Sequence, residues 1–204
     1  MDHILIIAGD ILDRGTMGND LIRYLEKLIE KKRLLGVLGN HDLFLIDIMN
    51  DNYRLEKVLF NISKNGFIET LQLGFKRDIR NFEVTKELIE EFKKNFSMKY
   101  PIFVKWILEL PLYLEFNHHV IVHGFLDFSL RDWKYTSQRF AIWDRGYAKE
   151  IPCSFHKKLV FGHTPNYHIN KQDNIIYEGL KIMIDGGAAS RHQVNILYLT
   201  EREI

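Results

Sequence analysis

The chain has 204 residues, enough for one domain with a sizeable hydrophobic core. Hydrophobic residues make up 46% and charged residues 27%, a globular composition that argues against disorder. The formal net charge of +1 gives no support to nucleic-acid or membrane binding by bulk electrostatics. The single cysteine, Cys153, excludes an internal disulfide and fits a reducing compartment, and no apolar run approaches the roughly 20 residues of a membrane span. We therefore expect a cytoplasmic protein with neither nucleic acid nor membrane as a partner.

The first 40 residues follow the pattern of a strand, a helix and a second strand. Residues 4–8 (ILIIA) predict a buried strand, and residues 34–39 (LLGVLG) predict a second one. Between them, residues 19–33 (NDLIRYLEKLIEKKR) predict an amphipathic helix with Asn19 or Asp20 as its N-terminal cap. Its expected apolar face consists of Leu21, Leu25 and Leu28 or Ile29. This order favours a parallel pair of strands with a right-handed crossover.

Residues 43–108 differ in character from the segments on either side. They are rich in Lys, Glu, Asn and Phe at helical spacing, and we interpret them as a helical insertion over one edge of an α/β core. Strand patterns then return in five segments: LYLEF (112–116), HVIVHG (119–124), KLVFGH (158–163), LKIMIDGG (180–187) and VNILYL (194–199). Without repeats or a linker, the sequence predicts one α/β domain over residues 1–204.

Polar residues that can bind a metal ion follow four of the predicted strands: Asp10 with Asp13, Asn40 with His41, His123, and His163. In an open α/β sheet, ligands bind in the crevice beyond the carboxyl ends of the strands. Carboxylate, amide and imidazole ligands together suit Mn²⁺, Fe²⁺ or Zn²⁺, and there is no thiolate to select a softer metal. Taken alone, Asp10 could be a turn residue after Gly9. A fifth strand ends at Asp185, which we interpret as a residue that positions the backbone rather than as a ligand.

Five short segments occur in the order and context of a known family: GDILDRG (9–15), GNHD (39–42), VHG (122–124), WDR (143–145) and GHTP (162–165). They resemble the motifs of the metallophosphoesterases. More narrowly, they resemble the phosphoprotein phosphatase family in its bacterial and phage form, with the diadenosine tetraphosphate hydrolases as close relatives. The resemblance covers nearly the whole chain and is weakest in residues 43–100. It implies a metallophosphoesterase-type α/β/β/α sandwich of two mixed sheets flanked by helices, here lacking the first strand and helix and carrying the helical insertion at 43–108.

The resemblance also implies a metal site. Asp10 resembles the carboxylate that bridges two metal ions, and Asn40, His123 and His163 resemble the remaining ligands of the second ion. Divalent ions are therefore the expected cofactors, with Mn²⁺ first and Fe²⁺ or Zn²⁺ as alternatives. The chemistry implied is in-line attack on phosphorus by a metal-activated hydroxide.

Four further residues resemble the family's catalytic and phosphate-binding groups. His41 resembles the general acid that protonates the leaving oxygen, and Asp13 resembles the carboxylate that orients it. Arg14 and Arg145 resemble the two guanidinium groups that hold the phosphoryl oxygens. For Arg145, an ion pair with its neighbour Asp144 on a surface loop is the alternative.

In the resembled family, an Asp-x-His motif on a strand of its own precedes GDxxDRG and binds the first ion. The sequence shows no counterpart before Asp10. Asp2 and His3 are adjacent, so in a strand they point to opposite faces, and at ~3.3 Å per residue the two lie roughly 23 Å from Asp10. We therefore expect a filled second site and a weak or empty first site. Two explanations stay open: the sequence begins at an internal methionine of a longer protein, or it is a shortened relative with altered chemistry.

The resemblance implies a metal-dependent phosphoesterase whose substrate is a phosphorylated protein or a small phosphoester. A serine/threonine protein phosphatase is the first interpretation. A diadenosine polyphosphate hydrolase is the alternative within the same chemistry, because both activities need the same phosphoryl-binding groups. A non-catalytic phosphate-binding module is the alternative from a different class. The sequence leaves the oligomeric state open.

Overall fold

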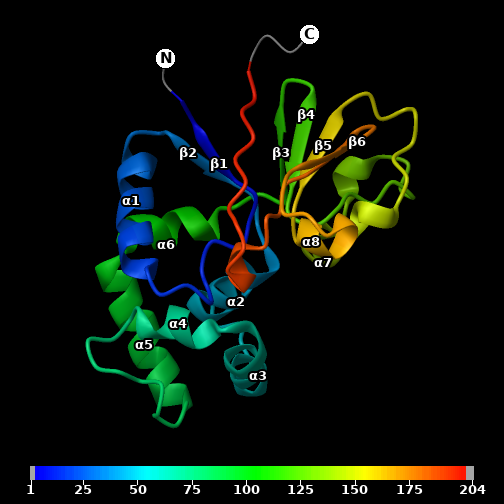
Figure 1. The fold of residues 1–204 in the computed structure, drawn as a ribbon. Coiled ribbons are helices and arrows are strands. Elements are labelled where there is room, and N and C mark those ends of the chain that lie inside the picture. The colour runs from blue at the N-terminus through cyan, green and yellow to red at the C-terminus, as the bar shows by residue number, and fades with distance from the viewer. Residues whose placement is uncertain (1–2, 201–204) are drawn as a thin grey trace. The chain divides into compact units, whose positions relative to one another are not determined.

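The computed structural model describes residues 3–200, so the expectation for Asp2 lies outside the described residues. These residues divide into two compact units, which we describe separately. The helical unit comprises residues up to 35 together with 41–110, and the sheet unit comprises residues 36–40 and 111 onward (Figure 1). The interpretation of residues 1–204 as one domain stays a prediction.

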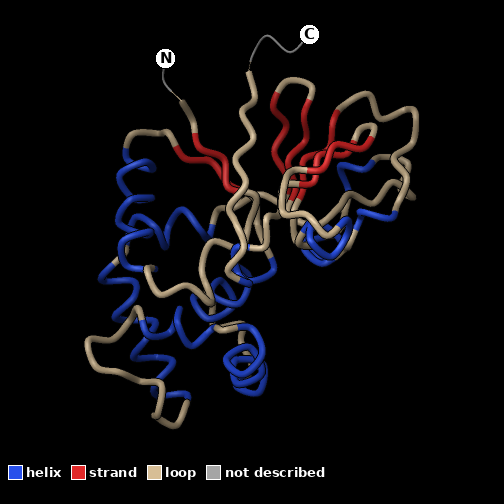
Figure 2. Tube along the Cα trace, in the orientation of Figure 1, coloured by secondary structure: helices blue, strands red, loops and turns tan. Residues whose placement is uncertain are grey.

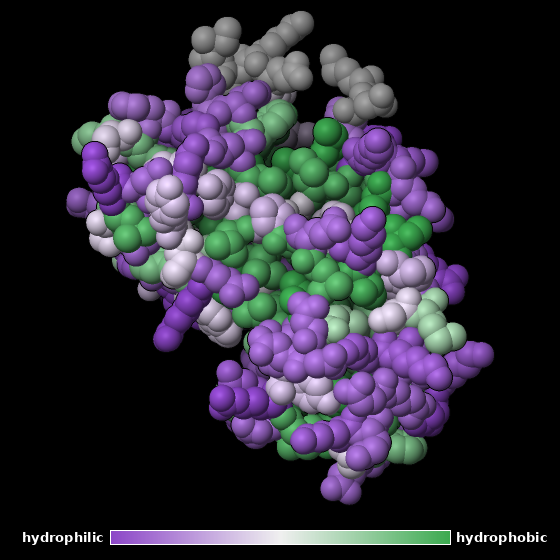
Figure 3. Space-filling view, turned by 180° about the vertical axis from the view of Figure 1, so that it is seen from behind, coloured by the Kyte–Doolittle hydropathy of each residue, from purple (hydrophilic) through white to green (hydrophobic). Residues whose placement is uncertain are grey.

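The helical unit begins with the predicted order of strand, helix and strand. Strand β1 (Leu5–Ile7) pairs with β2 (Leu34–Gly36), and helix α1 (Gly18–Glu30) lies between them in sequence. Both strands are shorter than predicted, and the expectation that they are buried is wrong in part, because Leu5 and Leu35 are exposed. Figure 3 shows hydrophobic surface over these two strands in the view from behind.

Helix α1 buries Leu25 at 1% exposure, as predicted, but the predicted apolar face is wrong at Leu21. Ile22 is fully buried, whereas Leu21, which was expected in the core, is 37% exposed. The predicted cap at Asn19 or Asp20 is also wrong, because the helix begins before both residues and has no side-chain cap. The Asn19 amide oxygen instead accepts a hydrogen bond from Lys99 Nζ at 2.7 Å. The Asn19 side chain therefore makes a tertiary contact and does not cap the helix.

The prediction that residues 43–108 are helical is confirmed. Five helices cover this stretch: α2 (Asn40–Met49), α3 (Leu55–Asn65), α4 (Phe67–Gln72), α5 (Lys86–Lys99) and α6 (Pro101–Leu108). Figure 2 shows them joined by loops, with no strand anywhere in this fully described stretch. None of the helices in the described residues is long and apolar enough to cross a membrane.

Aromatic side chains form much of the core of the helical unit. Those with no more than 1% exposure are Phe67, Phe92, Phe96, Tyr100 and Phe103. Phe67 on α4 packs edge-on against Phe44 on α2, with ring centroids 6.3 Å apart. Because close-packed rings leave little room for movement, this contact fixes α4 relative to the first helix that follows β2.

The sheet unit contains a mixed five-stranded sheet within the described residues, in the order β3-β4-β5-β7-β6. Its strands are β3 (Tyr113–Phe116), β4 (His119–Val122), β5 (Lys158–Phe161), β6 (Ile176–Glu178) and β7 (Lys181–Met183). Strands β4, β5 and β7 are parallel, and the two edge strands are antiparallel to their neighbours. The short helices α7 (Gln138–Trp143) and α8 (Asn166–Asn170) belong to the connections. An α/β fold with a mixed sheet flanked by helices is therefore confirmed.

Two features of the sheet unit differ from the predictions. Residues 194–199 form a loop rather than a strand, and Figure 2 shows them as loop. Their alternating apolar residues Val194, Ile196 and Tyr198 are exposed, Tyr198 to 77%, because no edge strand of the described sheets pairs with them. Strand β6 was not predicted, because its three residues are too few to give a clear alternating pattern.

Candidate active site

The loop after β1 holds several residues in an unusual backbone conformation. Asp10, Asp13 and Arg14 have φ values of 56°, 76° and 58°, in the left-handed region that non-glycine residues seldom adopt. The carboxylate of Asp42 on α2 accepts the N–H groups of Asp10 and Ile11, each at 2.9 Å. These two charge-assisted hydrogen bonds stabilise the strained turn and orient the Asp10 side chain.

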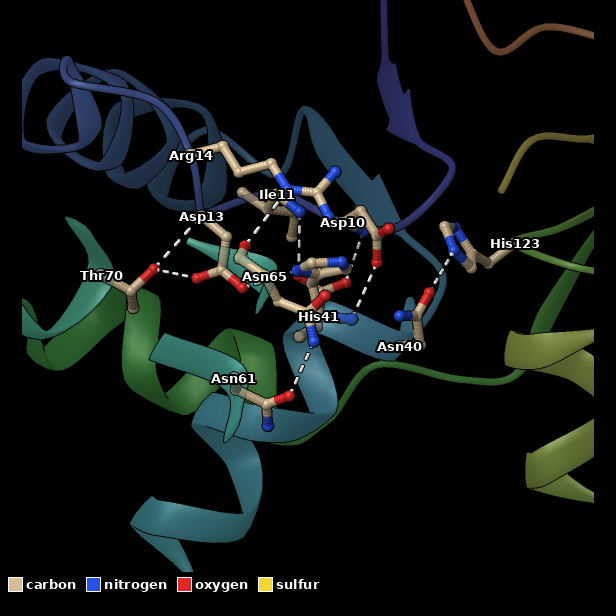
Figure 4. A network of polar contacts seen from close by, with 11 residues as sticks. Asp10, Ile11, Asp13, Arg14, Asn40, His41, Asn61, Asn65, Thr70 and His123 are labelled. Atoms are coloured by element: carbon tan, nitrogen blue, oxygen red, sulfur yellow. Dashed lines mark hydrogen bonds and ion pairs between the residues drawn. The ribbon is translucent and has the colours of Figure 1, made fainter. Parts of the chain in front are cut away.

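The Asp10 carboxylate lies at the N-terminus of α2. Its Oδ1 accepts a hydrogen bond from the His41 backbone N–H at 2.9 Å (Figure 4). The first N–H groups of a helix lack partners within the helix, and the partial positive charge there favours a carboxylate. The strand end and the helix start therefore bring Asp10 and His41 together.

His41 and Asp13 form a hydrogen-bonded dyad. His41 Nδ1 lies 2.6 Å from Asp13 Oδ2, and the side chains are 11% and 3% exposed. Burial raises the pKa of the Asp13 carboxyl, an effect opposed by its hydrogen bonds with His41 and Thr70. Donation from Nδ1 to the carboxylate fixes the imidazole ring and leaves Nε2 as the atom that can deliver a proton.

The backbone and the side chain of Arg14 both contact the turn between α3 and α4. The Arg14 N–H donates to the carbonyl oxygen of Gly66 at 3.3 Å, and Nε donates to the carbonyl oxygen of Asn65 at 3.2 Å. The two terminal guanidinium nitrogens make no hydrogen bond to the described residues and remain exposed. The hydrogen bond at Nε therefore orients the Arg14 side chain, and its two terminal nitrogens are left to bind a group such as a phosphoryl oxygen.

In the sheet unit, two imidazole side chains follow neighbouring parallel strands. His123 follows β4, and His163 lies two residues after β5 with a φ of 64°. His123 Nε2 lies 3.0 Å from Asn40 Oδ1 and 3.2 Å from His163 Nδ1. Figure 4 shows the contact between Asn40 and His123. Two ring nitrogens and an amide oxygen that converge in this way are a donor set that fits Mn²⁺, Fe²⁺ or Zn²⁺.

Arg145 contacts the loop that carries His163. Its Nη1 donates to Thr164 Oγ1 at 3.1 Å, and the rest of the side chain is exposed. The alternative ion pair with Asp144 is not present among the described residues, because Asp144 pairs with Lys149 at 2.6 Å. Arg145 thus offers free guanidinium N–H groups beside the histidine of the same unit.

Three residues that were not predicted as site residues hold these groups in place: Asp42, Thr70 and Thr164. Asp42 and Thr164 lie inside the quoted motifs GNHD and GHTP, so the signal for them was present. Thr70 lies where the resemblance is weakest, and no pattern indicated it. Asp185 accepts the Gly187 N–H at 2.8 Å, which agrees with its interpretation as a backbone-positioning residue.

The chain was compared with protein families, with curated proteins and with solved structures. The model of the calcineurin-like phosphoesterase family matches residues 2–185. A solved structure described as "Crystal structure of a putative diadenosine tetraphosphatase" aligns with 92% of this chain and 72% of its own, at 14% identity and a TM-score of 0.48. No curated protein matches the chain by sequence.

Proposed function

Because the chain belongs to the calcineurin-like phosphoesterase family, we propose that it hydrolyses phosphoserine and phosphothreonine residues of proteins with the help of divalent metal ions. The observation that carries this proposal is the 2.6 Å contact between His41 Nδ1 and Asp13 Oδ2. An alkoxide is a poor leaving group, so hydrolysis of a phosphoserine ester needs a positioned proton donor. A module that only binds phosphate has no need of one.

The proposed metal ligands are Asp10, Asn40, His123 and His163, with Mn²⁺ as the first choice of ion. The convergence of Asn40 Oδ1, His123 Nε2 and His163 Nδ1 within the sheet unit supports three of these four. Divalent ions in such a site supply an activated hydroxide and neutralise charge on the phosphoryl oxygens. For Asp10, the support is its place in GDILDRG and its orientation by the N-terminus of α2.

The other residues of the site bind the substrate and deliver a proton. In the proposal, Arg14 and Arg145 hold the phosphoryl oxygens through the guanidinium N–H groups that remain exposed. His41 donates the proton on Nε2 to the leaving oxygen, while Asp13 stabilises the charged imidazole through Nδ1.

The proposal is tested by phosphate release from phosphoserine, phosphothreonine and phosphotyrosine peptides and from diadenosine tetraphosphate, with Mn²⁺ supplied. We expect turnover of the phosphoserine and phosphothreonine peptides. His41→Asn should lower kcat by about 10²–10⁴-fold with the metal content unchanged, while the exposed His118→Asn serves as control.

The outcomes separate the alternatives. Preferential cleavage of diadenosine tetraphosphate would show that the proposed substrate class is wrong and that the proposed phosphoesterase activity is right. Tight binding of metal and phosphopeptide without turnover of any substrate would instead identify a non-catalytic phosphate-binding module.

A further inference from the structure

Thr70 on α4 makes two hydrogen bonds to Asp13, which is 57 residues away in sequence. Its hydroxyl oxygen accepts the Asp13 N–H at 3.1 Å, and the hydroxyl donates to Asp13 Oδ1. Thr70 is 1% exposed. Figure 4 shows both contacts beside the Asp13–His41 pair.

These contacts determine the orientation of the Asp13 carboxylate. Oδ1 accepts from Thr70 and Oδ2 contacts His41, so rotation of the carboxylate breaks one of the two hydrogen bonds. The Asp13 backbone is held by the same hydroxyl in a left-handed conformation, with φ at 76°. Since Phe67 packs α4 against α2, and α2 carries His41, the hydroxyl and the imidazole lie on elements that are fixed to each other.

We propose that Thr70 is a positioning residue that acts through Asp13 on the general acid His41. The proposal rests on the proposed function, in which His41 protonates the leaving group. Loss of the hydroxyl frees the carboxylate to rotate and leaves the imidazole without a fixed direction for Nε2. The effect therefore falls on proton delivery and leaves substrate binding largely unchanged.

The first test compares two substrates that differ in their need for a proton. Thr70→Val, which removes the hydroxyl and keeps the side-chain volume, should lower kcat for a phosphoserine peptide about tenfold or more with KM little changed. For 4-nitrophenyl phosphate, whose leaving group is stable as an anion, the loss should be much smaller. Thr70→Ser retains the hydroxyl and should restore kcat.

Thr136 provides a matched control. It is 4% exposed, its Oγ1 accepts the Asp127 N–H at 2.9 Å, and its hydroxyl donates to the Trp133 carbonyl oxygen. Thr136→Val should therefore lose a comparable hydroxyl, with a comparable loss of stability, and keep wild-type kcat. An equal fall in kcat in both valine variants, or an equal fall with both leaving groups, would overturn the proposal.

A second measurement needs no turnover. In the metal-free protein, the ¹⁵N resonances of the His41 ring report its hydrogen bond to Asp13, and His41→Asn identifies them by their loss. They should shift in Thr70→Val and keep their positions in Thr70→Ser and Thr136→Val. Resonances that stay in place in Thr70→Val would refute the positioning role. If the wild type turned over no phosphoester, the proposed function would fail while this comparison still decided the role of Thr70.

Discussion

Asp42 holds Asp10 by its backbone: one carboxylate oxygen of Asp42 accepts the Asp10 N–H at 2.9 Å, and the other accepts the next N–H along the chain at the same distance. Asp10 adopts a φ of 56°, in the left-handed region that residues other than glycine seldom occupy. The conformation persists because α2 supplies two acceptors that match the two donors of the turn. A helix residue thus determines where the carboxylate that follows β1 points.

Asp42→Asn should therefore destabilise the protein and disturb the loop. An amide presents an N–H₂ group to one of the two N–H donors, so one buried donor loses its partner. We expect a loss of about 1–3 kcal/mol in the free energy of unfolding, measured in urea. Asp47→Asn on the same helix is the control, because Asp47 makes a longer contact of 3.3 Å with Asn52 at the surface. A similar loss in both variants would show that the turn does not depend on Asp42.

The sequence predicted those parts of the candidate site in which a polar residue closely follows an apolar strand in the chain. Apolar runs followed directly by Asp10, His123 and His163 predicted strand ends that carry polar groups, and the structure has strands there. The role of Thr70 could not be predicted, because its partner Asp13 is 57 residues away and nothing in the α4 sequence indicates the contact. The prediction of a strand at 194–199 was wrong. An alternating pattern gives a segment one apolar and one polar face, but it does not provide a neighbouring strand with which the segment can pair.

His123→Ala should lower the metal content of the protein. His123 Nε2 lies between Asn40 Oδ1 and His163 Nδ1, so its removal takes away the central donor of the three. After dialysis against Mn²⁺, we expect substoichiometric metal in the variant and a smaller rise in melting temperature on addition of Mn²⁺. The exposed His156→Ala should match the wild type. Equal Mn²⁺ content in all three proteins would remove His123 from the ligand set.

Asp13 should make folding stability depend on pH in the metal-free protein. Burial raises the pKa of its carboxyl from the ordinary 3.8, so the folded state binds the proton more tightly than the unfolded state. That contribution favours folding at low pH and is lost as the pH rises through the folded-state pKa, above which the buried charge is a cost. We expect Asp13→Asn to melt at a higher temperature than the wild type near pH 7. The difference should shrink as the pH is lowered towards about 4. A variant that is less stable than the wild type across this range would contradict the expectation.

Gly66 should control the orientation of Arg14. A Cβ at this position would lie 2.6 Å from Arg14 Cγ and 3.2 Å from the Arg14 backbone, and the glycine has a φ of 73°. Gly66→Ala must therefore both strain its own backbone and displace the residue proposed to hold phosphate. We expect a rise of about tenfold in KM for a phosphopeptide, which corresponds to about 1.4 kcal/mol.

Gly179 separates these two effects. Its φ is 58°, but a Cβ there would meet nothing within 4 Å, so Gly179→Ala carries the backbone strain without a collision. Each alanine variant should lose roughly 1 kcal/mol of stability from the left-handed conformation, with a further loss in Gly66→Ala as Arg14 moves. Only Gly66→Ala should raise KM. If the two variants had the same KM, the contact between Gly66 and Arg14 would have no part in substrate binding.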